Sequence, residues 1–189
     1  VKFKYTPENI NISSNEEFYS KIKELLRIIF NSDFFDSKLL GEDSNKISEG
    51  LQILRESFNK NSISVLFLMF DLILKYFCVK SVFFNQNPIF NKAMLDFLDD
   101  FYDNLLNYRS EEENILNDTE SYSLIYLLLE KIAIPKLKEH SKIILDKYTT
   151  IVKANKIFSI LLYYYESRNG KMKLEILEFC TSMIMTDYI

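Results

Sequence analysis

The scarcity of glycine and proline constrains the fold of this chain more than any other feature of its sequence. Only three residues of each type punctuate 189 positions. A β-sandwich or β-barrel needs a turn about every ten residues, and those turns draw heavily on glycine and proline. The sequence therefore predicts an all-α fold.

Apolar residues recur at helical spacing in runs that alternate with short polar breaks. The breaks fall at 31–45, 79–88, 133–142 and 166–171, each between two helix-like runs. This pattern makes four helix–turn–helix units of roughly 35–50 residues, the period of HEAT or armadillo arrays. The run from Ser62 to about Cys78 is apolar nearly all round, as expected of a helix buried between stacked neighbours. We expect a right-handed α-solenoid of about four HEAT-like repeats over 15–189, after a polar tail or strap at 1–14.

Charge and cysteine content exclude several classes of protein. The net charge is −4, whereas a generic nucleic-acid binder usually carries a basic excess. Cys78 and Cys180 lie in apolar helical runs without a CxxC motif, which indicates buried, reduced thiols in a cytosolic protein. The run 63–79 is the one membrane candidate, but Asp71 and Lys75 interrupt it. We expect no nucleic acid and no membrane among the partners.

The sequence contains no motif of an enzyme. GxxxxGK and HExxH are absent, and three glycines cannot build a dinucleotide fingerprint. His140 is the only histidine and has no histidine or cysteine near it in sequence, which argues against a metal site or acid–base catalysis. An interaction module without cofactor or metal is the expected class.

Basic side chains recur at corresponding places in successive breaks. Lys80 lies in the second break, Lys136 and Lys138 follow the proline of the third, and the last contains Arg168 and Lys171, with Lys173 just beyond. Stacked repeats align their intra-repeat turns along one edge, so these residues would form a basic ridge. Taken singly, each is more simply an ordinary solvated turn residue. Lys138 is expected to lie already on the following helix.

Four segments resemble repeats of the TOG domain of the microtubule polymerase family, the ch-TOG and Mini spindles type. "FDLILKYFCVKSVFFNQNPIFNKAMLDFLDDF" (70–101) resembles the second repeat and "LIYLLLEKIAIPKLKEHSKIIL" (124–145) the third. "ANKIFSILLYYYESRNGKMKLEILEFCTSMI" (154–184) resembles the fourth, and "IIFNSDFFDSK" (28–38) fits the first loop more loosely. The resemblance covers about 28–184 and is closest to the last TOG domain of the polymerase.

The chain departs from that family pattern in three respects. Insertions fall near Gly41 and at Ser81–Val82, and tryptophan is absent although early domains of the family often present one in the first loop. The sequence also ends after four repeats, where the family has about six. We therefore expect a domain over 15–189 that is incomplete at its C-terminus, in a piece of a larger protein.

The resemblance implies a tubulin-binding module that regulates microtubule dynamics in the cytoplasm, at microtubules, the spindle or its poles. Its partners would be the tubulin heterodimer or the microtubule lattice, with further TOG domains on the same chain. The implied contact residues are Phe34, Phe35, Lys80, Asn85, Asn87, Lys136, Lys138, Arg168, Asn169, Lys171 and Lys173.

Two alternatives stay open at this point. Phe34 and Phe35 would either replace the missing tryptophan as an apolar anchor or pack into the core at the end of the first helix. The second alternative concerns the whole chain, which would be a HEAT or armadillo scaffold that binds another protein or a peptide and does not contact tubulin.

Overall fold

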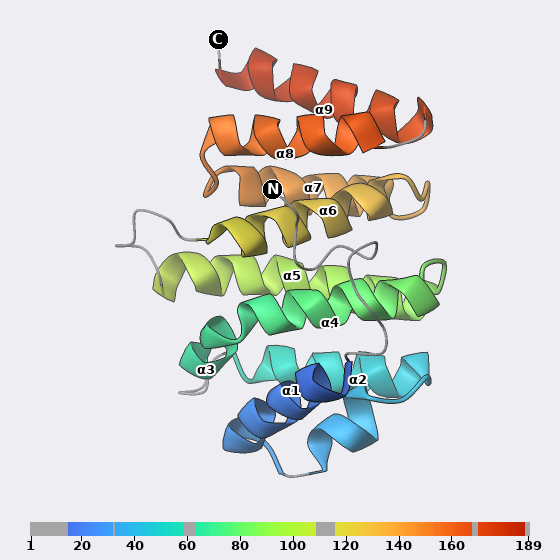
Figure 1. The fold of residues 1–189 in the computed structure, drawn as a ribbon, viewed down its shortest axis with the longest axis vertical. Helices are drawn as coiled ribbons and strands as arrows, with labels where there is room; N and C mark the ends of the chain where they lie inside the picture. Colours follow the sequence, from blue (N-terminus) through green and yellow to red (C-terminus); the bar gives the residue numbers. More distant parts are fainter. Residues whose placement is uncertain (1–14, 32, 59–62, 109–115, 168–169, 188–189) are drawn as a thin grey trace. The chain divides into compact units, whose positions relative to one another are not determined.

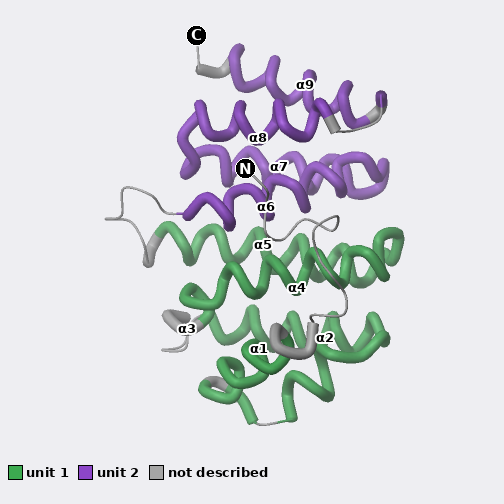
Figure 2. The backbone as a smooth tube through the Cα atoms, viewed as in Figure 1, with its two compact units in different colours: residues 1–115 green, residues 116–189 purple. Residues whose placement is uncertain are grey.

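The computed structural model describes residues 15–31, 33–58, 63–108, 116–167 and 170–187. Helices and the turns that join them make up all of this described part, which confirms the all-α prediction. The chain divides into two compact units, 1–115 and 116–189 (Figure 2). The single domain expected over 15–189 stays a prediction.

The first unit is built from five α-helices and one π-helical turn among its described residues. They are α1 (Asn15–Ile29), η3 (Phe35–Leu39), α2 (Ser44–Glu56), α3 (Ile63–Leu68), α4 (Phe70–Phe83) and α5 (Pro88–Tyr108) (Figure 1). The helix α2 packs against both α5 and η3, while α1 packs against η3 and α4. The π-helical turn therefore fills the space between α1 and α2.

Local side chains set where α2 and α5 begin. The carboxylate of Asp43 accepts hydrogen bonds from the backbone N–H groups of Asn45 and Lys46, which caps α2. The side-chain oxygen of Asn87 accepts from the N–H of Phe90, 3.0 Å away, and Pro88 occupies the first position of α5. A polar cap followed by proline is a favoured start for a helix because the first N–H groups lack intrahelical partners.

A close approach of η3 to α2 requires glycine at position 50. A Cβ atom on Gly50 would lie 2.7 Å from Cδ2 of Leu39 and 2.9 Å from Cβ of Lys38. The absence of a side chain therefore lets η3 lie directly on α2.

The core of the first unit is an aromatic cluster centred on Phe101. Its ring stacks on Phe70 at 4.2 Å between centroids, and Phe67, Phe58 and Phe97 lie at 4.9, 5.6 and 5.8 Å. All five side chains are almost completely buried. The abundance of phenylalanine in the sequence thus serves packing between α3, α4 and α5 and the end of α2.

Tyr76 joins α4 to η3. Its buried hydroxyl donates a 2.9 Å hydrogen bond to the carbonyl of Leu39. Burial raises the pKa of Tyr76 well above its ordinary value, and the neighbouring Tyr19 adds to that shift. The protonated phenol is therefore the form that the fold accommodates.

A pH dependence follows from Tyr76. Above about pH 10 the unfolded chain loses the phenolic proton while the folded chain retains it, so the free energy of unfolding falls as pH rises through that range. Urea unfolding of the wild-type chain and of Tyr76→Phe between about pH 8 and 11 measures this contribution. We expect Tyr76→Phe to cost about 1 kcal/mol at neutral pH and to flatten the alkaline decline. An equally steep decline in both proteins would contradict this assignment.

The second unit consists of two helical pairs. They are α6 (Asp118–Ile132) with α7 (Lys138–Thr149), and α8 (Ala154–Ser167) with α9 (Gly170–Asp187). The helix α6 packs against α7, α8 and α9. Figure 1 shows that the α6–α7 turn and the first residues of α9 lie at the same end of this unit.

The expected extent of one helix is wrong. The helix predicted from Ser62 to about Cys78 is in fact two helices, α3 and α4, which are separated at Met69, and α4 continues to Phe83. The residues after Cys78 remain helical because Val79 and Lys80 are buried by tertiary contacts. In the second unit, Asn117 and Glu120 form a capping box that begins α6.

Among the described residues, no helix combines the length and the apolar character needed to cross a membrane.

Candidate functional site

The candidate site is the set of turns within the helical pairs, where the sequence places basic residues.

Lys80 is a structural residue in α4. Its side chain is only 5% exposed, and its ammonium donates to the carbonyls of Leu40 and Gly41 at 2.8 and 2.7 Å. Burial lowers the pKa of Lys80, although the carboxylate of Glu42 opposes that shift. The prediction that Lys80 belongs to an exposed basic edge is therefore wrong. It instead holds the segment before α2 against the end of α4.

Asn85 and Asn87 lie in the α4–α5 turn as predicted, but some of their hydrogen-bonding groups already have partners near this turn. The carbonyl of Asn85 accepts from the buried side-chain amide of Asn91 at 2.8 Å. The side chain of Asn87 caps α5. Asn85 is exposed and Asn87 half-buried, so the exposed side chain of Asn85 is the better placed of the two for a polar contact.

Phe34 and Phe35 pack into the core of the first unit. They are 6% and 2% exposed. The ring of Phe34 stacks on Phe30 at 4.3 Å, and that of Phe35 lies 5.8 Å from Tyr19. The exposed apolar anchor suggested for this pair is thus corrected in favour of the core alternative, because the π-helical turn directs both rings inward.

Among the described residues of the first unit, an exposed aromatic side chain lies at the end of α4. Phe83, at the end of α4, is 58% exposed, and its neighbour Val82 is 52% exposed. Phe84 is half-buried, with its ring 5.3 Å from Phe90. Val82 and Phe83 are not among the contact residues that the resemblance implies. Helical register accounts for the exposure of Val82, which lies on the side of α4 away from the buried residues Tyr76, Phe77 and Lys80, but not for that of Phe83, which lies on the same side as Tyr76.

Lys136 is an exposed residue of the α6–α7 turn. Two backbone bonds shape this turn, from the N–H of Ile134 to the carbonyl of Lys131 and from the N–H of Leu137 to the carbonyl of Ile134. Pro135 precedes Lys136 and is itself exposed. Within the described part of the chain, Lys136 has no ion-pair partner, so its ammonium is available to a binding partner.

Lys138 begins α7, as predicted, but its charge is compensated. Its ammonium lies 2.8 Å from Glu175 and 3.7 Å from Glu178, both on α9. Lys142 lies 3.9 and 3.7 Å from the same two carboxylates. The hydrogen bond to Glu175 raises the pKa of Lys138 above its ordinary value. This cluster joins α7 to α9.

The α8–α9 turn contains the remaining predicted residues. Arg168 and Asn169 lie outside the described residues. Lys171 belongs to the first turn of α9, which begins at Gly170. Lys173 is half-buried, with its ammonium 5.1 Å from the centre of the Tyr165 ring, a cation–π distance. Lys171 and Lys173 are thus helical rather than loop residues.

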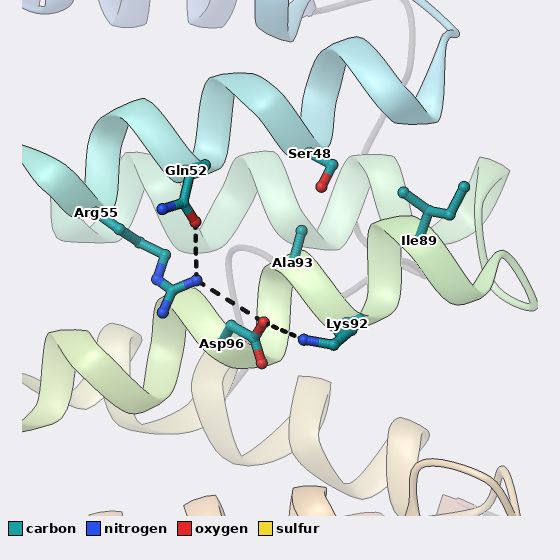
Figure 3. Close-up of a pocket in the computed structure, with 7 residues that line it drawn as sticks. All are labelled: Ser48, Gln52, Arg55, Ile89, Lys92, Ala93 and Asp96. Atoms are coloured by element: carbon teal, nitrogen blue, oxygen red, sulfur yellow. Dashed lines mark hydrogen bonds and ion pairs between the residues drawn. The ribbon is translucent and has the colours of Figure 1, made fainter.

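A pocket of about 290 Å³ lies between α2 and α5 in the first unit (Figure 3). Its charged side chains neutralise one another: Lys92 lies 2.8 Å and Arg55 3.8 Å from the carboxylate of Asp96. Arg55 also pairs with Asp100 at 2.7 Å and donates to Gln52 at 3.1 Å. This arrangement links the two helices and leaves no uncompensated charge to attract an ionic ligand.

In the described residues, no three or more His, Cys, Asp or Glu side chains gather where they could hold a metal ion. His140 is a half-buried residue of α7. Cys78 is buried and Cys180 is half-buried, and neither forms a disulfide.

Comparison with known proteins finds no family model that matches the sequence and no solved structure that matches the chain.

Proposed function

We propose that this chain is a TOG-like module, built from a right-handed solenoid of HEAT-like repeats, that binds tubulin. The contact is centred on the two turns of the second unit. The module belongs to a regulator of microtubule dynamics that acts at cytoplasmic microtubules or the spindle. Tubulin heterodimer or lattice is the partner, and further TOG domains on the same chain would raise the local concentration of bound subunits.

The observation that carries this proposal is an exposed lysine on the α6–α7 turn at the end of the second unit where α9 also begins (Figure 1). Lys136 is that exposed residue, and Lys171 belongs to the first turn of α9. The ion pair between Lys138 and Glu175 joins the start of α7 to α9. A row of cations on rigid turns suits an acidic protein surface, because it accelerates encounter and orients the partner without a deep pocket.

The test is binding of the chain to soluble tubulin at low salt. Charge reversal at Lys136, Arg168 and Lys171 to glutamate should weaken binding about 10–100-fold, because attraction becomes repulsion at three neighbouring positions. Affinity should also fall steeply with added salt for the wild-type chain, since exposed charges are screened. Fluorescence titration across a salt series measures both effects.

A matched control lies at the opposite end of the same unit. Lys153 is an exposed lysine in the α7–α8 connection, so Lys153→Glu makes the same change of charge as Lys136→Glu away from the two turns. Lys136→Glu alone should weaken binding, and Lys153→Glu should not. Equal losses from both would mean that net charge, and not the turns, governs affinity.

The alternative, a scaffold for another protein, is favoured by the exposed Val82 and Phe83 of the first unit. Exposed aromatic and aliphatic residues at one turn suit an apolar contact. Such a contact would be insensitive to salt and would be lost in Phe83→Ala. Absence of tubulin binding by the wild-type chain, even at low salt, would favour this second function.

A further inference from the structure

A cavity of about 400 Å³ opens in the second unit, where the end of α7 meets the start of α8 and the end of α9. Figure 1 shows these three segments together at the end of the unit opposite the α6–α7 turn. The described residues of the cavity wall include Asp146, Thr149 and Thr150 at the end of α7, Ala154 and Ile157 of α8, and Met183 of α9. Ligand sites in proteins commonly span about 300–1,000 Å³, so this volume is large enough for a small organic ligand.

Asp146 is the single charged residue among the described residues that line the cavity. Within the described part of the chain, its carboxylate forms no hydrogen bond and no ion pair. Lys142, one helical turn earlier, pairs instead with Glu175 and Glu178 of α9, at 3.9 and 3.7 Å. Burial raises the pKa of Asp146, and the attraction of Lys142 offsets that shift only in part. The negative charge of Asp146 is therefore incompletely compensated by the chain itself.

The place of Asp146 on its helix adds to the attraction for a cation. Asp146 lies in the last turn of α7, which ends at Thr149. The C-terminus of a helix carries about half a negative elementary charge, which favours cations and disfavours carboxylates. Lys147 lies in the same turn, but it is not among the residues that line the cavity. The carboxylate and the helix end thus both favour a positively charged ligand in the cavity.

The two threonine hydroxyls of the cavity wall act toward a ligand only as hydrogen-bond acceptors. Thr149 donates its hydroxyl proton to the carbonyl of Asp146 at 2.7 Å, and Thr150 donates its own to the carbonyl of Lys147 at 2.7 Å. Because a hydroxyl has a single proton, a ligand that contacts either oxygen must supply the donor. An ammonium group has three N–H donors, no acceptor and a positive charge, so it matches both the hydroxyls and the carboxylate.

Apolar side chains form another part of the wall. Ile157 is buried and Met183 is half-buried, and both line the cavity with Ala154. These side chains suit the hydrocarbon part of an organic cation. A metal ion is a poorer fit, because Ca²⁺ takes about six to eight oxygen ligands and Asp146 is the one carboxylate among the described lining residues.

We propose that this cavity binds a small alkylammonium ion. The ammonium group lies between the carboxylate of Asp146 and the hydroxyl oxygen of Thr149, and the hydrocarbon chain packs on Ile157 and Met183. The site is separate from the proposed tubulin contact, since it occupies the end of the unit opposite the α6–α7 turn (Figure 1).

Titration of the whole chain with butylammonium chloride, followed by proton–nitrogen NMR correlation spectra, tests the site. We expect saturable shifts at the amides that border the cavity, with a dissociation constant on the order of 1 mM, which a ligand of about five non-hydrogen atoms can reach. Asp146→Asn should weaken binding about 10-fold or more, because it retains the shape of the side chain and removes the charge that the ammonium contacts. Circular dichroism checks that each variant is folded.

Glu139→Gln is the matched control for Asp146→Asn. Glu139 is an exposed residue in the first turn of the same helix, away from the cavity, so its replacement also removes one negative charge from α7. It should leave the affinity for butylammonium unchanged. Absence of saturable binding to the wild-type chain, or equal losses in the two variants, would overturn the proposal.

A second pair of variants tests the hydrogen bond to the ligand. Thr149→Val should weaken binding about 3–10-fold, because valine keeps the branched shape but has no oxygen to accept from the ammonium. Thr181→Val should have no effect, because Thr181 is an exposed residue of α9 whose hydroxyl likewise donates to a backbone carbonyl, that of Leu177. An affinity unchanged by Thr149→Val would contradict the placement of the ammonium group.

Three further probes identify the chemistry of the ligand. Butyltrimethylammonium has the charge without N–H donors, and n-butanol has a donor without the charge, so each should bind about 10-fold more weakly than butylammonium. Nα-acetyl-lysine amide presents the same ammonium group on a bulkier frame and should bind no more tightly. Clearly tighter binding of this probe would overturn the assignment to a free ion in favour of a lysine side chain of another protein. No tubulin is present in these experiments, so their outcome is independent of the proposed function.

Discussion

Replacement of Phe101 by alanine is expected to lower the free energy of unfolding by about 3–5 kcal/mol. Phe101 is fully buried and stacks on Phe70 at 4.2 Å, with three further rings around it. Its removal loses the favourable free energy of burying a large apolar side chain. It also leaves a cavity that the rigid neighbouring rings fill poorly. Urea unfolding followed by circular dichroism measures the change.

Phe83→Ala is the matched control for this prediction. It removes the same side chain from a position that is 58% exposed. Little burial is lost there, so we expect a change within about 0.5 kcal/mol. Similar losses in both variants would mean that the aromatic cluster is not the stabilising core of the first unit.

Replacement of Lys80 by methionine is expected to destabilise the chain by about 1.5–3 kcal/mol, the contribution of hydrogen bonds to a charged group. Methionine retains the packing of the aliphatic stem but leaves the carbonyls of Leu40 and Gly41 without their shared donor. The segment before α2 would then lose its attachment to α4. Hydrogen exchange of the amides around residue 41 should quicken in parallel with the loss measured by urea unfolding.

Lys136→Met provides the comparison for Lys80. The same change of side chain at an exposed turn should alter stability by less than about 0.5 kcal/mol. Tubulin binding should show the reverse order of effects. Lys136→Met should weaken binding, because Lys136 is a proposed contact, and Lys80→Met should not, because Lys80 is not a proposed contact. Unchanged stability in Lys80→Met would return Lys80 to the set of candidate binding residues.

Several features could be predicted from the sequence because they depend on local composition. Few glycines and prolines, together with helical periodicity, indicate helices in pairs, and the described residues confirm an all-α fold. The placement of Lys138 on the helix after the third break is also confirmed, since Pro135 ends the preceding helical pattern and α7 includes Lys138.

Other features depend on contacts between residues far apart in sequence. From the sequence, Lys80 is predicted to be a turn residue, but its hydrogen-bond partners in the structure are the carbonyls of Leu40 and Gly41, some forty positions earlier. Lys138 is likewise predicted to belong to a basic edge, but in the structure its ammonium lies 2.8 Å from Glu175. A pattern of charges along one helix does not indicate which charges another helix will compensate.

The sequence by itself determined that the described residues of this chain fold into helices and that lysines recur near the breaks in the helical pattern. The tertiary structure alone decided which side chains those turns present to a partner. Phe34 and Phe35 are buried while Phe83 is exposed, and Lys80 is buried while Lys136 is exposed. Helix formation follows from propensities and spacing within a few residues, whereas exposure depends on which surfaces meet when the helices pack.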